Sequence, residues 1–257
     1  MFALDEREFH RVIPLLREYN HTCPTFAYSV AEKFISGMIY VDDINRPTTI
    51  LVSTENQVLF IAGNEWNGAF NKQLMEFLYL NQRFTLFSAT KEWDHVFHDY
   101  LNDQVTPMMR YKFSFHPKKY PQQKKELPQN FLIKEINEET IELTSHFNQK
   151  YYNQYWGSVA NFLNDGFGYC MLDNGRIISE CTSIFRSTSI AEIDIVTEKE
   201  YTGNGLAYVL GLYFINKCIE EGLTPSWDCD ANNIPSMKLA KKLGFDHAKE
   251  YSIFLKK

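Results

Sequence analysis

A strand, a loop with two glycines and an amphipathic helix follow one another over residues 192–219, and this stretch constrains the fold more than any other. Its first six residues alternate and are rich in β-branched side chains, which predicts a strand. Gly203 and Gly205 lie in the loop, and from Leu206 onward apolar residues recur at helical spacing. Glycines let a backbone approach a phosphate, and the first N–H groups of a helix point at it. We therefore predict an anion site at this loop.

Two common phosphate-binding patterns do not fit the loop. A Walker loop needs a lysine directly after its second glycine, and no lysine follows Gly203 or Gly205. A dinucleotide fingerprint needs a small residue three positions after the second glycine, where this chain has Tyr208. A glycine pair after a strand is more often a plain connection, and the loop alone leaves that alternative open.

Composition excludes several classes of protein. The net charge of −6 argues against a nucleic-acid-binding surface and is compatible with a cationic amine as substrate. We find no secretory signal at the start and no apolar run near the roughly 20 residues that span a bilayer. The five cysteines form no Cys-x-x-Cys pair and fit free thiols in a reducing compartment. We expect a cytoplasmic protein without a membrane or nucleic-acid partner.

The chain divides at a segment with three prolines and four lysines, for which we predict a linker over residues 117–130. Residues 1–116 then form an N-terminal α+β domain of helices, a small antiparallel meander and further strand and helix segments. Their order resembles that of the second half, so this domain is either a degenerate copy of the same fold without its cofactor loop or an unrelated α+β domain. His95 and His98 lack a third ligand, and we expect no metal site.

The second half, residues 131–257, predicts a mixed sheet. Asn174-Gly175 marks the tip of a hairpin, and the strand at 190–197 follows it. Three antiparallel strands thus lead into the glycine loop, and the strand after the loop helix crosses back parallel to the strand before the loop. Asn233 or Ser236 caps a further helix, Gly244 ends it, and a strand at 251–255 closes the chain. The overall class is α+β with a mixed sheet.

Two motifs in this half resemble those of the GCN5-related N-acetyltransferases. The pyrophosphate loop of that family, Gln/Arg-x-x-Gly-x-Gly/Ala, is matched at its glycines, whereas Glu200 departs from the first position and Thr202 and Asn204 replace basic residues. The later motif, Asn-x-x-Ala/Ser-x-x-Leu-Tyr-x-x-x-Gly-Phe, is matched except that Ala240 stands where the tyrosine would be. Longer stretches of this half look like those of the zwittermicin-resistance-like subfamily of acetyltransferases.

This resemblance implies acetyl-CoA as cofactor. The backbone of Ile195, Val196 and Thr197 would hold the pantetheine, and a main-chain N–H would polarise the acetyl carbonyl. The pyrophosphate would lie on the N–H groups of the loop, and two residues of the later motif complete the cofactor set: Thr202, Gly203, Asn204, Gly205, Leu206 and Ala207, with Asn233 and Ser236.

The implied reaction is direct attack of a small molecule's primary amine, antibiotic-like or polyamine-like, on the thioester. A general base is needed, and Glu192 and Asp194 share one face of a strand, with Glu192 the first choice. Cys229 and Tyr251 are alternative donors to the leaving thiolate or buried structural residues. A CoA-binding sensor without turnover and a transferase with a larger acyl donor stay open, as does the oligomeric state, with a homodimer as one alternative.

Overall fold

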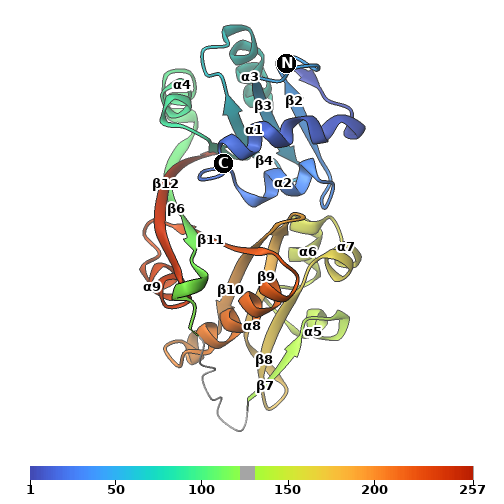
Figure 1. Cartoon of the computed structure of the whole chain (residues 1–257), viewed down its shortest axis with the longest axis vertical. Coiled ribbons are helices and arrows are strands. Elements are labelled where there is room, and N and C mark those ends of the chain that lie inside the picture. Colours follow the sequence, from blue (N-terminus) through green and yellow to red (C-terminus); the bar gives the residue numbers. More distant parts are fainter. Residues whose placement is uncertain (122–130, 257) are drawn as a thin grey trace. The chain divides into compact units, whose positions relative to one another are not determined.

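The structure, a computed structural model, describes residues 1–121 and 131–256 and divides the chain into two units (Figure 1). The N-terminal unit comprises residues 1–112 together with 249–257, and the C-terminal unit comprises residues 113–248. Strands β6 (Thr106–Phe115) and β12 (Phe245–Lys256) each begin in one unit and end in the other. In the described part of the chain, no helix is long and apolar enough to cross a membrane.

The N-terminal unit is built on a mixed sheet. Strands β1 to β4 pair antiparallel in chain order, β5 is parallel to β4, and the end of β12 pairs antiparallel with β5. The strands of this sheet are β1 (Phe2–Ala3), β2 (Gly37–Val41), β3 (Thr49–Thr54), β4 (Val58–Gly63) and β5 (Phe84–Ser88). The helical segments are η1 (Glu6–Val12), α1 (Ile13–Glu18), α2 (Thr25–Ala31), α3 (Gly68–Leu80), α4 (Lys91–Leu101) and η2 (Asn102–Gln104).

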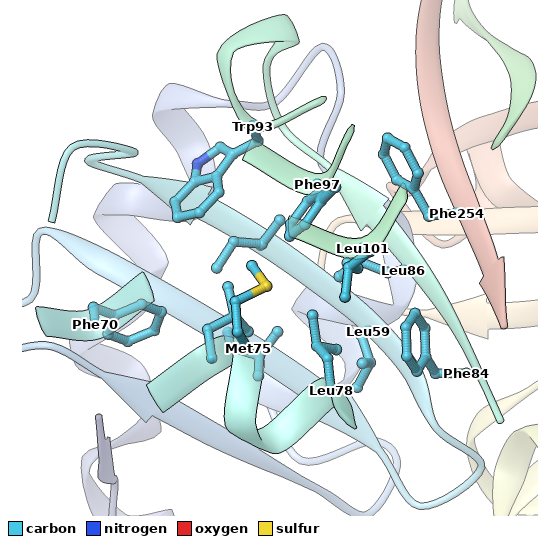
Figure 2. Packing of buried hydrophobic residues seen from close by; sticks show 13 residues of the cluster. Leu59, Phe70, Met75, Leu78, Phe84, Leu86, Trp93, Phe97, Leu101 and Phe254 are labelled. Carbon is cyan, nitrogen blue, oxygen red and sulfur yellow. The ribbon is translucent and has the colours of Figure 1, made fainter. Parts of the chain in front are cut away.

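Helices cover both faces of this sheet. Apolar side chains of α3 and α4 form one buried cluster with alternate residues of β3, β4 and β5, as Figure 2 shows. Phe254 of β12 belongs to the same cluster, and its ring packs against Phe97 of α4 with centroids 5.2 Å apart. On the opposite face, Phe26 of α2 packs edge-on against Phe87, which alternates with the cluster residue Leu86. The core of the N-terminal unit thus includes the last strand of the chain.

The C-terminal unit repeats this plan. Strands β7 to β10 pair antiparallel in chain order, and β11 is parallel to β10. The strands are β7 (Phe131–Glu135), β8 (Gly168–Asp173), β9 (Arg176–Arg186), β10 (Ile190–Thr197) and β11 (Thr224–Asp230). The helical segments are η3 (Pro117–Lys119), α5 (Glu138–Leu143), α6 (Gln149–Trp156), α7 (Val159–Asp165), η4 (Lys199–Tyr201), α8 (Leu206–Glu220) and α9 (Ile234–Lys242).

Alternation along β9 separates the two faces of the C-terminal sheet. Tyr152 of α6 donates to the Thr182 hydroxyl at 3.2 Å, whereas the neighbouring Cys181 lies on the face that α8 covers. The predicted hairpin is confirmed, and its tip residues Asn174 and Gly175 have φ of 48° and 83°, as a tight turn requires. The expected α+β class with a mixed sheet is confirmed in both units.

The repeat extends to the order of elements. In each unit, helices precede three antiparallel strands, a helix follows, and the next strand is parallel to the last of the three. This shared order supports the degenerate-copy interpretation of the N-terminal half over an unrelated domain.

Three expectations about the chain need correction or restriction. The last strand was expected to close the C-terminal domain, but residues 249–257 belong to the N-terminal unit, because β12 pairs there with β5. Residues 117–121 of the predicted linker contain η3 and pack in the C-terminal unit, where Tyr120 donates to Asn216 Oδ1 at 2.7 Å. The rest of that predicted linker, 122–130, lies outside the described residues. The sequence pattern predicts a helix from Glu138 to Phe147, but the helix that begins at Glu138 ends early, at Leu143.

Candidate functional site

Strands β10 and β11 separate partway along their length. Over the described residues their parallel ladder joins Ile190, Ala191 and Glu192 to residues 224–226, yet β10 continues to Thr197 and β11 to Asp230. The pairing of β10 with β9 shifts register between Glu192 and Ile193, which marks a β-bulge at the same point. Beyond that point β10 keeps its ladder with β9 alone. Its other edge can form backbone hydrogen bonds with an extended ligand.

The glycine loop follows directly from this edge. Gly203 and Gly205 have φ of 83° and 80°, and Gly205 is the N-cap of α8 without a side-chain cap. A Cβ added at Gly203 would meet nothing within 4 Å, so the space in front of its backbone is open. Asn204 Nδ2 and Thr202 Oγ bond back to carbonyls of η4 at 3.1 and 2.8 Å, which fixes the loop. The uncapped N–H groups of a 15-residue helix therefore face outward at a rigid turn, as anion binding requires.

A cavity of about 750 Å³ lies at this loop, between the start of α8 and one side of α9. Its walls come from the end of β10, the loop and first turn of α8, and one side of α9: Thr197, Tyr201, Thr202, Gly203, Gly205, Leu206, Ala207, Tyr208, Pro235, Lys238, Leu239 and Lys242. The volume lies within the range of roughly 300–1,000 Å³ typical of small-molecule sites. The cavity is therefore large enough for part of a nucleotide cofactor.

Two lysines of α9 supply positive charge to this cavity. Lys238 and Lys242 are four residues apart and so lie on one side of the helix. Within the described residues neither forms an ion pair with a carboxylate of the protein. Two cations thus line the cavity from α9, whereas the glycine loop itself contributes none. We did not predict this from the sequence, although the i, i+4 spacing together with Pro235 and Leu239 was a readable signal.

Six of the eleven expected cofactor residues line the cavity: Thr197, Thr202, Gly203, Gly205, Leu206 and Ala207. Ile195 and Val196 lie on the separated part of β10, and Asn204 points its amide back into the loop. Asn233 caps α9 by accepting from Ser236 N at 3.1 Å, and Ser236 Oγ accepts from Trp227 Nε1 at 3.0 Å. Asn233 and Ser236 therefore have a local structural role in the orientations seen here.

Asp194, one of the two expected bases, faces α6. Its Oδ2 accepts a hydrogen bond of 2.8 Å from the hydroxyl of Tyr151, and its Cα pairs with Thr182 of β9. Burial, and then the negative charge of Asp194, raise the pKa of Tyr151 well above its usual value. The hydroxyl therefore stays a donor and holds the carboxylate in one orientation. In the sequence, Tyr151 belongs to a cluster with Tyr152, Tyr155 and Trp156 that fits a substrate groove or core packing equally well, and its link to Asp194 is not apparent there.

Glu192, the other expected base, lies at the end of the β10–β11 ladder, opposite Ser226. Because side chains alternate along a strand, Ser226 and Asp228 project from the same side of β11. Asp228 of β11 is thus a third half-buried carboxylate, in addition to Glu192 and Asp194 of the neighbouring strand β10. This concentration of negative charge favours a cationic ligand on the α6 face.

Glu180 is a buried carboxyl on the same face as Asp194. It pairs with Val196 across β9 and β10, and the hydroxyl of Thr144 donates to it. Burial raises the pKa of Glu180 above its ordinary value. The enclosure and the bond to Thr144 indicate a structural role.

The alternative donors to a leaving thiolate have different surroundings. Ala240, at the position of the family's tyrosine, is fully buried and offers no proton. Cys229 is buried on β11. Tyr251 belongs to the N-terminal unit, where its hydroxyl accepts from Arg110 Nε at 3.1 Å.

The N-terminal unit differs at the equivalent positions. Its parallel strands β4 and β5 stay paired from Val58 to Ile61, and Ala89 N extends the ladder by donating to Ile61 O at 3.1 Å. The loop before α3 is fixed by Asp42, whose carboxylate accepts from Asn67 Nδ2 at 3.2 Å. The separated strands and the open glycine loop of the C-terminal unit are therefore not reproduced among the described residues of this copy.

Comparisons with known proteins agree with this geometry. A family profile described as GNAT acetyltransferase matches residues 14–254. The chain is 42% identical over 236 residues to the uncharacterized N-acetyltransferase YdfB of Bacillus subtilis (strain 168), covering 90% of each sequence.

Solved structures give the same result for the fold. A GCN5-related N-acetyltransferase-like protein from Streptococcus suis 89/1591 is 26% identical, with a TM-score of 0.75 and coverage of 96% of this chain and 98% of that one. A tandem GNAT protein from the clavulanic acid biosynthesis pathway is 10% identical, with a TM-score of 0.66 over 99% and 97% of the two chains, and shows the fold alone. The chain belongs to the GNAT acetyltransferase family, whose members are acyltransferases that generally take the acyl group from acetyl-CoA.

Proposed function

We propose that this protein transfers the acetyl group of acetyl-CoA to a primary amine of a small cationic molecule. The observation that carries the proposal is the continuous path from the separated edge of β10 to the glycine loop and its cavity. An extended amide-containing arm fits the strand edge, and a pyrophosphate fits the loop. Acetyl-CoA contains both groups in that order.

The residues present suit this donor. Backbone N–H groups of the loop and of the first turn of α8 would bind the pyrophosphate, with the positive end of the helix dipole behind them. Lys238 and Lys242 would neutralise its negative charge from the opposite wall. Ile195, Val196 and Thr197 would offer their backbone to the amides of the pantetheine arm.

The acceptor would approach from the α6 face. Alkyl amines have a pKa near 10.4 and are protonated at neutral pH, so the carboxylates of Glu192, Asp194 and Asp228 attract them. Only the neutral amine is nucleophilic, and Asp194 or Glu192 would accept the proton that it loses. Tyr151 would hold Asp194 in place for this transfer. Bound acetyl-CoA supplies the thioester carbonyl that the amine attacks directly.

Release of free thiol tests the proposal. The full-length protein is incubated with acetyl-CoA and, separately, with spermidine, kanamycin and benzylamine, and thiol is followed with a chromogenic disulfide. We expect amine-dependent release that the Glu192→Gln, Asp194→Asn double variant loses, while that variant still binds CoA in calorimetry. CoA binding without thiol release for any amine would contradict a transferase of this specificity. Release with a larger acyl-CoA but not with acetyl-CoA would contradict the assigned donor.

A further inference from the structure

The N-terminal unit contains a cavity of its own, separate from the glycine loop. It has a volume of about 300 Å³, the lower end of the range for small-molecule sites. Its walls come from the segment after α1, the end of β5, the start of α4, and strands β6 and β12. All of these residues belong to the N-terminal unit. This unit lacks the separated strands of a donor site, so a role for the cavity must be sought in its own side chains.

One carboxylate is fixed in this cavity. Asp94, half-buried in the first turn of α4, accepts a hydrogen bond from Ser88 at Oδ1 and another from Ser252 at Oδ2, the latter at 2.6 Å. The three residues come from α4, β5 and β12, so tertiary packing determines the orientation. A carboxylate with each oxygen held by a hydroxyl keeps lone pairs for a further donor.

Asp94 lacks an ion-pair partner in the part of the chain that the structure describes, although it lies in the first turn of α4, where the helix dipole favours a carboxylate. Among the residues that the structure describes, no lysine, arginine or histidine nitrogen lies within 4.0 Å of it. The other charged residues of the cavity wall are exposed: Lys91, Glu92, Lys249 and Glu250. Three carboxylates and two ammonium groups line the cavity, and the Arg110 guanidinium lies behind this wall, where its Nε donates to the Tyr251 hydroxyl at 3.1 Å. Partial burial of a carboxylate that has hydroxyl donors but no ion-pair partner is costly, and an ammonium group of a ligand offsets that cost.

The rest of the wall indicates what such a ligand carries. Thr22, Ser88, Thr90, Tyr251 and Ser252 contribute hydroxyl groups. Thr90 Oγ accepts a long bond of 3.4 Å from Trp93 N and keeps its own proton for another acceptor. A bound metal ion is disfavoured, because the described residues contain no group of three or more His, Cys, Asp and Glu side chains suited to one. The chemistry therefore matches an ammonium group on a hydroxylated carbon frame.

We propose that the N-terminal unit binds a small hydroxylated primary amine, with Asp94 as the anchor of its ammonium group. The ligand is bound and not acetylated there, since the ladder of β4 and β5 leaves no edge for an acyl-CoA. The proposal is independent of the acetyl-transfer site and of the acceptor assigned to it.

Calorimetry on the full-length protein without CoA tests the site, with glucosamine as the probe. N-acetylglucosamine, which has the same frame without the positive charge, is the matched ligand control. We expect glucosamine to bind at millimolar or better affinity and N-acetylglucosamine to bind at least tenfold more weakly. Equal binding of the two sugars, or no heat from glucosamine at 10 mM, would overturn the proposal. This comparison uses the wild-type protein and needs no variant to fold.

Three variants locate the binding. Asp94→Asn keeps the shape and the capacity to bond to both serines while removing the charge, and we expect at least a tenfold loss of glucosamine affinity. Glu92→Gln removes an exposed carboxylate of the same wall and should change affinity less than twofold. Asp194→Asn removes charge at the proposed acetyl-transfer site, so glucosamine bound weakly as an acceptor there is lost, whereas the binding that depends on Asp94 should remain. Retained binding in Asp94→Asn, or loss in Asp194→Asn instead, would refute the assignment.

Discussion

The hydroxyl of Tyr151 on α6 donates a 2.8 Å hydrogen bond to Oδ2 of Asp194 on β10, which joins an aromatic helix to the strand that we assign to the reaction. The two residues are 43 positions apart in the sequence. Because the pKa of Tyr151 is raised by burial and by the Asp194 charge, its hydroxyl stays protonated and remains a donor at alkaline pH. This contact gives the first prediction.

Tyr151→Phe should move the acid limb of the pH–rate profile upward. A hydrogen bond to a charged group contributes about 1.5–3 kcal/mol, and its loss raises the pKa of the acceptor carboxyl by on the order of one unit. The measurement is kcat/KM against pH with the best amine from the thiol assay. Tyr155→Phe is the matched control, since Tyr155 packs against Tyr151 with ring centroids 4.8 Å apart and its change should leave the limb in place. Equal shifts in the two variants would argue for general loosening of α6.

Replacing the two candidate bases separately should identify the one that accepts the proton. A positioned base contributes about 100-fold or more, so Asp194→Asn or Glu192→Gln should lower kcat by that factor while the KM for acetyl-CoA changes little. Asp228→Asn removes the third carboxylate and should raise the KM of a cationic amine without such a fall in kcat. A fall in kcat of less than tenfold in both single variants would remove side-chain base catalysis from the mechanism.

Lys238→Met and Lys242→Met should weaken the binding of acetyl-CoA. Both lysines are exposed, and an exposed ion pair contributes up to about 1 kcal/mol, or about fivefold in affinity for each lysine. Lys241→Met removes a charge from the same helix outside the cavity wall and serves as the control. Affinity for CoA, measured at 50 and 300 mM salt, should depend less on salt in the double variant than in the control. Identical effects of Lys241 and Lys242 would indicate long-range charge alone.

Gly203→Ala should impair cofactor binding more than a matched glycine elsewhere. A side chain at positive φ costs roughly 1–2 kcal/mol, and a methyl group at Gly203 would also occupy open space at the loop that we propose binds the pyrophosphate. Gly222, after α8, has φ of 70° and equally open surroundings, so Gly222→Ala carries the same strain away from the cavity. Both variants should lose similar stability in urea unfolding. We expect a rise of about tenfold in the KM for acetyl-CoA in Gly203→Ala alone.

Glu180→Gln should change how stability depends on pH. The raised pKa of Glu180 means that the folded state binds more protons than the unfolded state above pH 4.5, so the wild type loses stability as pH rises through the folded value. Glutamine keeps an acceptor for Thr144 and never ionises. Urea unfolding should therefore show the variant gaining on the wild type between pH 4.5 and 8, with the difference smallest at acid pH. A constant difference across that range would show that Glu180 does not titrate on folding.

Local signals predicted most of the elements. The hairpin at Asn174-Gly175, the loop at Gly203 and Gly205 and the cap at Asn233 each rest on residues a few positions apart, and the structure contains all of them. Lys238 and Lys242 were missed because their role depends on α9 lying beside a loop some 35 residues earlier in the chain. From the sequence, we looked for basic residues only within the glycine loop itself, and the loop contains none.

The pairing of β12 could not be predicted for a similar reason. An apolar, alternating final segment satisfies the edge of either sheet, and strand pattern alone does not specify its partner. The same pairing brings together Ser88 and Ser252, which orient Asp94. The two serines are 164 residues apart in the sequence, and the hydroxyl of Ser88 also contacts the carbonyl of Ser252. Long-range contacts of this kind are visible only in three dimensions.

Phe254 belongs to the buried cluster of α3 and α4. During synthesis on the ribosome, this cluster can therefore be completed only after the C-terminal end of β12 has been made. When residue 112 emerges, the N-terminal unit still lacks the strand that pairs with β5, and it must wait while the whole C-terminal unit is made. During that interval β5 has an unpaired edge, which is a hazard for aggregation. Maturation of the N-terminal unit therefore comes after translation of the acetyl-transfer unit, and loss of a few C-terminal residues would damage the half of the protein made first.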